Sequence, residues 1–205
     1  MNTTNYKTLQ EHMFGVFEDK DLILEGSSYL VSVNSRGNKR IISKDGDFNF
    51  YFNKKTGLTI KYGETIEDDP AYNPFGNEIA DIEIVKSCEG IRNSEGKRNQ
   101  CQFCYKSMKD GSLYMKFETF KKIFDKLNSP KTMTQIAFGV DASCTVNPDV
   151  WKIFDYCNEN DVTPNLTVAD IDENTARNIV SRAGACAVSY YPLRDANRCF
   201  DSVTM

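Results

Sequence analysis

The sequence contains a single histidine, His12, and this scarcity limits the chemistry open to the chain. A Ser-His-Asp triad would have only His12 as its base, and no catalytic motif surrounds that residue. Metal sites that need two histidines are excluded. A lone histidine far from the cysteines is more typical of a surface or packing role than of a metal ligand.

Long apolar runs and an excess of positive charge are also missing. No stretch approaches the ~20 apolar residues that a membrane span needs. Residues 1–7 are not an apolar signal segment, so we expect a cytoplasmic protein with no membrane partner. The net charge of −4 gives no electrostatic reason to expect nucleic-acid binding. The hydrophobic content of 40% and charged content of 26% are typical of a globular chain.

Cysteine, in contrast, is plentiful, with seven residues. An odd number in a reducing compartment argues against a disulfide framework and for metal or reactive chemistry. Cys157 and Cys186 lie in apolar patterns and are predicted to be small core residues. Cys144 follows a predicted strand and Cys199 lies near the C-terminus, so we do not assign either of them to the core.

The N-terminal part of the chain has the two-residue period of β-strands. Residues 29–33, 40–43, 48–52 and 58–62 are rich in β-branched and aromatic residues, and each connecting segment contains a glycine that can adopt positive φ. We expect residues 1–62 to form a small antiparallel β meander, with a short helix over 6–17. Acidic residues, two prolines and a glycine then indicate a linker over residues 63–78.

From residue 79 the pattern alternates between strand and helix. Strands are predicted at 81–86, 134–138, 165–169 and 186–191, with amphipathic helices between them. Asn147 and Asp172 are predicted to cap the second and third helices, Val180 to face inward, and Gly184 to end the third helix. We therefore predict an α/β fold in which residues 79–205 form a parallel sheet or partial (β/α) barrel. A closed barrel needs about 250 residues, so either the sheet is open or the chain is part of a longer one.

Three cysteines follow the first predicted strand of this sheet. Cys88, Cys101 and Cys104 have the spacing C-x12-C-x2-C, on a loop at the strand end where α/β sheets usually place their chemistry. Three thiolates around an iron–sulfur cluster would leave one iron able to bind a substrate or cofactor. The same spacing fits a structural zinc site with Cys144 as the fourth thiolate. The spacing by itself leaves both readings open.

With the strand, the three-cysteine loop and the βα repeats together, residues 79–191 resemble the radical S-adenosylmethionine (radical SAM) superfamily. In that family a strand leads to Cys-x3-Cys-x-aromatic-Cys, often followed by tyrosine. Here residues 81–88 and Cys101-Gln-Phe-Cys-Tyr105 match both ends of the pattern, but the first gap is twelve residues instead of three. The polar run inside that gap is predicted to be a flexible excursion. Where the family carries Gly-Gly-Glu-Pro, this chain has Gly139-Val-Asp141.

The resemblance implies a [4Fe–4S] cluster that binds S-adenosylmethionine (SAM) at its fourth iron. The implied cluster ligands are Cys88, Cys101 and Cys104, and the implied SAM contacts are Phe103 (adenine), Gly139 and Asp141 (methionine amino group) and Ser189 (ribose). A reduced ferredoxin- or flavodoxin-like donor would supply one electron, releasing methionine and a 5′-deoxyadenosyl radical that abstracts hydrogen from an unknown substrate. The alternative is a non-catalytic, zinc-stabilised binding module whose β meander contacts a partner.

Overall fold

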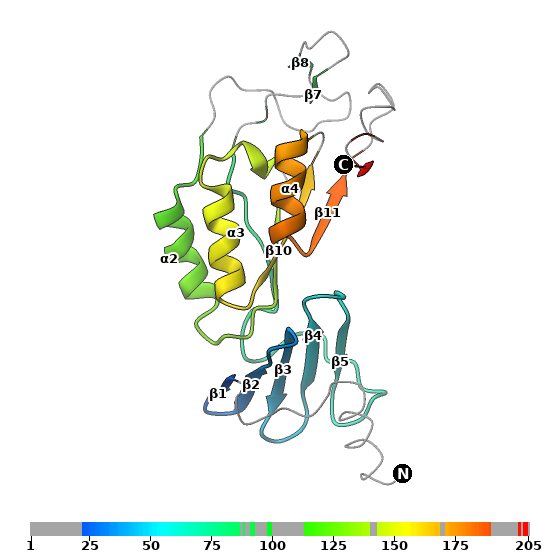
Figure 1. Cartoon of the computed structure of the whole chain (residues 1–205). Coiled ribbons are helices and arrows are strands. Elements are labelled where there is room, and N and C mark those ends of the chain that lie inside the picture. The colour runs from blue at the N-terminus through cyan, green and yellow to red at the C-terminus, as the bar shows by residue number, and fades with distance from the viewer. Residues whose placement is uncertain are drawn as a thin grey trace. The chain divides into compact units, whose positions relative to one another are not determined.

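The computed structural model describes residues 22–86, 88, 91–92, 98–99, 113–139, 143–168, 171–189, 201 and 203–204. The chain divides into two compact units, Met1–Gly76 with Pro130–Thr132, and Asn77–Ser129 with Met133–Met205. The predicted mixed α/β fold is confirmed, with an antiparallel sheet in the first unit and a parallel sheet in the second (Figure 1). Within the described ranges, no helix has the length and apolar character to cross a membrane. The helix predicted over residues 6–17 lies outside them.

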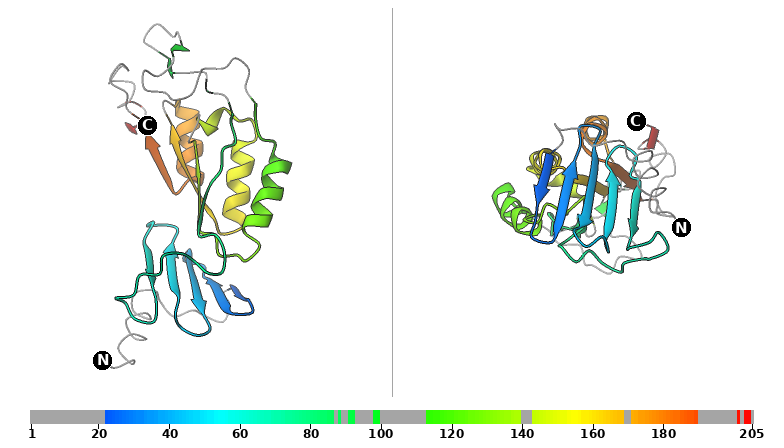
Figure 2. Two further views of the ribbon diagram at one scale, coloured as in Figure 1. Left: turned by 180° about the vertical axis from the view of Figure 1, so that it is seen from behind. Right: turned by 90° about the horizontal axis from the view of Figure 1, so that it is seen from below.

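The first unit contains a five-stranded antiparallel meander. Its strands follow one another in the sheet in chain order (Figure 2): β1 (Leu22–Glu25), β2 (Tyr29–Val33), β3 (Asn38–Ser43), β4 (Asn49–Asn53) and β5 (Thr59–Tyr62). The strand registers place Val31, Ile41 and Phe50 in one cross-strand row, which is the centre of this unit's hydrophobic core. The turn glycines have the positive φ expected of them, 82° at Gly37, 84° at Gly46 and 71° at Gly57.

The second unit contains a four-stranded parallel sheet in the order β11-β10-β9-β6. Its elements are β6 (Ile79–Asp81), α2 (Phe117–Leu127), β9 (Gln135–Phe138), the 3₁₀ turn η1 (Cys144–Val146), α3 (Val150–Glu159), β10 (Thr163–Val168), α4 (Glu173–Arg182) and β11 (Ala185–Val188). A separate antiparallel pair joins β7 (Ile91–Arg92) to β8 (Arg98–Asn99). Helix α3 lies between α2 and α4 and packs against both (Figure 1). Because successive strands are parallel neighbours, right-handed crossovers put all three helices on one face of the sheet.

The two faces of the parallel sheet differ in chemistry. On the helix-covered face, register pairs Ile136 with Pro164 and Phe138 with Leu166, and all four are buried. The alternate positions on the other face carry mostly small or polar side chains: Asp81, Gln135, Ala137, Thr163, Asn165, Thr167, Ala185 and Ala187. Thr163 among them is buried, and the same face also carries Ile79, a large apolar residue that is 54% exposed. There the Asn165 amide donates to Gln135 Oε1 at 2.8 Å. Among the described strands, no closed barrel forms.

Two of the predicted core positions are wrong, for one reason. Val180 is 81% exposed on α4, and Cys186 is exposed on β11. Strand β11 is the edge of the described sheet, and among the described helices α4 has a neighbour only on its α3 side. Apolar residues on this last βα unit therefore have fewer described partners than the pattern implies. Cys157, on the central helix α3, is fully buried as predicted.

One of the predicted helix-end roles is wrong, while the positions of the other two are confirmed. Helix α3 has Asp149 at its N-cap, so Asn147 does not cap it. Gly184 follows the C-cap Ala183, so it ends α4 as predicted, but it does not adopt positive φ. It lies beside β10, where an added Cβ would overlap the Thr163 side chain. Asp172 caps α4 as predicted, because its Oδ1 accepts from the backbone N–H of Thr175 at 2.7 Å.

Candidate functional site

The two ends of the loop that carries the three cysteines, residues 87–112, meet just beyond the carboxyl end of β6. Val85 and Tyr114 form an isolated antiparallel bridge. Beside it, the backbone N–H of Lys86 donates to the carbonyl of Leu113 at 2.9 Å. The predicted strand over residues 81–86 is thus shorter than expected. It is replaced by β6 at one end and by this loop-closing bridge at the other.

Asn147 connects both ends of the loop to the start of α3. Its amide nitrogen donates to the carbonyl oxygens of Ile84 at 2.9 Å and Met115 at 3.0 Å, and its Oδ1 accepts from the backbone N–H of Asp149 at 2.8 Å. The residue is 1% exposed, and the backbone N–H of Met115 adds a 3.0 Å bond to Ile84. One buried side chain therefore holds three segments together. The sequence reading missed this role, since no local signal distinguishes it from a cap.

Helix α2, which follows the loop, is tied to α3 at its first residue. Its N-cap, Lys116, makes no side-chain cap bond. Instead the Asp149 carboxylate accepts from the backbone N–H of Phe117 at 2.9 Å, and the Lys152 ammonium lies 4.0 Å from the centre of the Phe117 ring. A carboxylate suits a helix N-terminus because the unpaired N–H groups there carry partial positive charge. The chain leaving the loop is consequently fixed within one turn of its closure.

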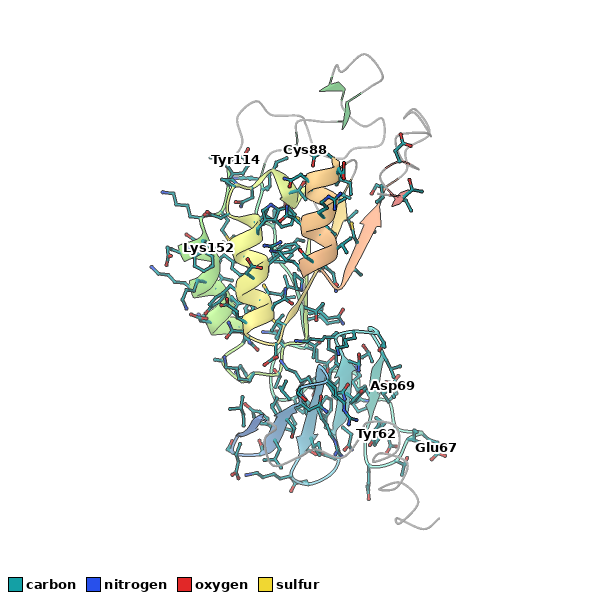
Figure 3. The ribbon with its side chains drawn as sticks, viewed as in Figure 1. Tyr62, Glu67, Asp69, Cys88, Tyr114 and Lys152 are labelled. Carbon is teal, nitrogen blue, oxygen red and sulfur yellow. The ribbon has the colours of Figure 1, made fainter. Side chains whose placement is uncertain are left out.

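The four described cysteines occupy three different environments. Cys88, two residues beyond Lys86, is half-buried against the core of the second unit (Figure 3). Cys144 is 1% exposed, and burial raises its pKa to about 12; burial also raises the pKa of Cys157. Cys186 is exposed. Cys101 and Cys104 lie outside the described residues, and the described ones contain no group of three potential metal ligands.

Of the four residues predicted to contact SAM, the structure describes two, Gly139 and Ser189. Gly139 directly follows β9 with φ of 95°, a conformation that favours glycine. Ser189 directly follows β11, and its backbone N–H donates to Val168 at 2.8 Å. Because the strands are parallel, Cys88, Gly139 and Ser189 all lie at the carboxyl edge of one sheet. Phe103 and Asp141 lie outside the described residues.

The gap between Cys88 and Cys101 contains the β7–β8 pair. Ile91 pairs with Asn99, and Arg92 with Arg98, in antiparallel register. Paired residues in such a ladder are about 5 Å apart, so residues 91–99 begin and end at nearly the same place. Figure 1 draws β7 and β8 beyond the end of the second unit toward which β10 and β11 point. The predicted excursion therefore contains a strand pair at these four positions, which the sequence reading did not foresee, since two-residue strands are too short to leave a periodic pattern.

This arrangement places cysteine, glycine and hydroxyl groups along the sheet edge where α/β proteins commonly bind ligands. Comparison with known proteins assigns no relative: no protein-family model, curated protein or solved structure matches the chain.

Proposed function

We propose that the chain is a radical SAM enzyme, with a [4Fe–4S] cluster held by Cys88, Cys101 and Cys104 and a substrate still to be identified. The β7–β8 pairing is the observation that carries the proposal. The first cysteine gap exceeds the family spacing by nine residues, and the paired segment 91–99 contains nine residues. Without that segment the chain reads Cys88-Glu-Gly-Gln-Cys101, which is Cys-x3-Cys. The unusual gap is then the family motif with a hairpin inserted.

The parallel sheet supports a partial (β/α) barrel as its setting. Open α/β sheets are normally covered by helices on both faces. Here the described helices α2, α3 and α4 lie on one face, and the other presents mostly small and polar side chains such as Asp81, Asn165 and Thr167, with Ile79 as a large apolar exception. That distribution is the one expected of an inner barrel face that meets a polar ligand. The strand order, in which each strand pairs with the next in the chain, suits the same geometry.

The cysteine environments favour an open three-thiolate centre over a zinc site with four thiolates. Cys144 was the candidate fourth zinc ligand, but it is buried in the apolar core with a raised pKa. A metal ligand must lose its proton, and burial opposes that loss. Cys88 has a different position, half-buried at the sheet edge beside the loop closure. A centre of three thiolates leaves a position for an exogenous ligand.

When bound, the cluster would supply the electron that splits SAM, and the chain would position the reactants. Gly139 has no Cβ, so backbone and ligand can approach closely there. Asp141 would accept hydrogen bonds from the SAM ammonium, and Ser189 would bond the ribose. The backbone at Phe103 would meet the adenine. Asn147 would hold both ends of the ligand-bearing loop, and a reducing cytoplasm would keep the thiols available.

The test is anaerobic reconstitution with iron and sulfide, followed by electron paramagnetic resonance of the dithionite-reduced protein with and without SAM. We expect about four irons per chain, a reduced-cluster signal that shifts with SAM, and release of 5′-deoxyadenosine. Cys101→Ala should abolish all three. Cys186→Ala is the matched control, because it removes an exposed cysteine outside the motif. Protein that binds one zinc tightly and takes up no cluster would refute the proposal and leave the binding-module reading.

A further inference from the structure

The parallel sheet of the second unit has two open edges. Neither β11 nor β6 has a further partner among the described strands. In β11, Ala185 and Ala187 are exposed, and none of the four residues is charged. In β6, Ile79 is 54% exposed and Asp81 is also exposed. An exposed edge strand presents unpaired N–H and C=O groups, and one without charge or proline is suited to pairing with another strand.

The two outer helices of this unit also carry apolar side chains on their outer sides (Figure 1). On α4, Arg182 donates to a carboxylate of α3 at 2.8 Å, and Val180 lies about 200° away around the helix. On α2, Lys121 donates to a tyrosine of α3 at 2.7 Å, and Ile123 lies about 200° away around the helix. Val180 is 81% exposed and Ile123 is 36% exposed. Both side chains are therefore on the sides of these helices that face away from α3.

These features are those expected of half of a closed barrel. A (β/α)8 barrel has parallel strands inside and helices outside. The described sheet has four strands in chain order, with α2, α3 and α4 on one face. Its other face carries mostly small and polar side chains such as Ala137 and Thr167, which suit an interior that holds a small ligand. Two such sheets together have the strand number of the barrel.

We propose that two copies of this chain pair edge to edge, β11 of each with β6 of the other, and close one eight-stranded parallel barrel. A two-fold axis along the barrel makes the two junctions identical, so the assembly ends at two copies. The pairing satisfies the backbone groups of both edges, encloses Ile79 and brings the outer sides of α4 and α2 to the same junction. A second copy is the occupant that fits, because it supplies β6 to β11 and β11 to β6 in one step.

The closed barrel also places the carboxyl strand ends of both copies at one mouth. Ser189 directly follows β11, and the chain after β6 leads to Cys88. At each junction, Ser189 therefore lies next to the strand that leads to Cys88 of the partner subunit, so each candidate site is completed by the other copy. The pairing itself needs no cluster, and it is tested on metal-free protein, separately from the proposed function.

The experiment measures the mass of the full chain by sedimentation equilibrium at low and high micromolar concentration. Ala187→Glu places a charge on the β11 edge and Ile79→Lys places one on the β6 edge, both at side chains that are exposed in the single chain. Thr59→Lys is the matched control, because it places a charge on the exposed start of β5, an edge strand of the antiparallel sheet. Urea unfolding followed by Trp151 fluorescence checks that each variant is folded.

We expect the parent protein and the control to be dimers, and the dimer of each edge variant to be at least about tenfold weaker, because a charge buried without a partner is costly. Mixing the two edge variants should restore dimers, since one junction is then unsubstituted and the other carries opposite charges. Val180→Lys, on an 81% exposed helix position, should also weaken the dimer and replaces any edge variant that fails to fold.

A monomeric parent protein would overturn the proposal. A dimer that Ala187→Glu weakens and Ile79→Lys leaves intact would also overturn it, because that result describes two β11 strands paired with each other. Dimers that neither edge variant weakens would place the contact elsewhere on the chain, with the same consequence.

Discussion

Replacing Asn147 with alanine should destabilise the second unit by about 3 kcal/mol. The substitution removes three hydrogen bonds, to Ile84, Met115 and Asp149. Ile84 keeps its bond from the Met115 N–H, whereas the Met115 carbonyl and the Asp149 N–H lose the partner described here. A buried polar group without a partner costs about 1–3 kcal/mol, so two such groups cost about 2–6 kcal/mol. The Met115 carbonyl is only partly buried, which favours the lower half of that range.

Urea unfolding followed by tryptophan fluorescence measures this effect in the second unit specifically. Trp151 is the chain's only tryptophan; it lies in α3 and contacts the Phe154 ring edge-on at 5.8 Å between centroids. Asn158→Ala is the matched control. That amide also donates to two carbonyls, of Phe154 at 3.1 Å and Arg182 at 2.8 Å, but the side chain is half-buried and water can replace it. An Asn147→Ala loss no larger than the control's would refute the role assigned to Asn147.

The Asn147→Asp variant tests the same contacts through pH. An aspartate has no N–H, so its ionised oxygens would face the carbonyls of Ile84 and Met115, while the protonated form could donate one bond. Burial and these carbonyls should raise the folded-state pKa above the unfolded value of about 4. The resulting stability is present below pH ~4 and is lost as pH rises through the folded pKa. The free energy of unfolding of the variant should therefore fall from pH 4 to 7 relative to wild type, and a flat difference would contradict the model of two facing carbonyls.

Three further predictions use single sites in the second unit. Gly184→Ala should cost about 1–3 kcal/mol in urea unfolding, because the new methyl group would overlap the Thr163 side chain. Asp172→Ala should cost about 1 kcal/mol at pH 7, and less at acid pH, since hydrogen bonding to the helix N-terminus lowers the pKa of Asp172 and its contribution is lost as pH falls through that value. Iodoacetamide at pH 8 should label Cys186 well before Cys144, as read by peptide mass spectrometry, because Cys144 is buried with its pKa raised to about 12; equal labelling would contradict the burial.

Sequence reasoning succeeded where neighbours along the chain decide the structure. Turn glycines such as Gly37 have positive φ, and Asp172 caps its helix, because each of these features depends on residues within four positions. Alternating patterns also separated the antiparallel meander from the parallel sheet. The strand β1 was missed, since its residues Leu-Ile-Leu-Glu do not alternate between apolar and polar.

The remaining differences come from contacts that a local pattern does not contain. Asn147 precedes a proline and a helix, which locally indicates a cap, yet its amide bonds to a carbonyl 63 residues earlier. Val180 has the right helical spacing to face inward, but whether that face is covered depends on the neighbouring layer. The absence of a side chain at Gly184 is explained by the proximity of Thr163, which lies on β10. At the candidate site the sequence indicated the cysteines but not the contacts that close their loop.

The β7–β8 segment offers the most direct test of the proposed motif. Deleting residues 91–99 gives Cys-x3-Cys-x2-Cys and shortens the loop between the paired residues Lys86 and Leu113 from 26 to 17 residues. Loop-closure entropy changes slowly with length, so the deletion should stabilise the second unit by only about 0.4 kcal/mol. If the hairpin is an insertion, the deletion variant should retain its iron, sulfide and SAM-dependent resonance shift after reconstitution.

A replacement of residues 91–99 by nine glycines and serines is the control, because it keeps the length but removes the pairing. Iron content should then be highest in the deletion variant, lower in the parent and lowest in the replacement. In the replacement, Cys88 and Cys101 are joined by a flexible chain that does not hold them close together. A deletion variant that unfolds at the parent's urea midpoint, by Trp151 fluorescence, yet takes up no iron would separate folding from metal binding. In that case the twelve-residue gap itself would be needed to bring Cys88 and Cys101 to one centre, and the resemblance to a three-residue spacing would be fortuitous.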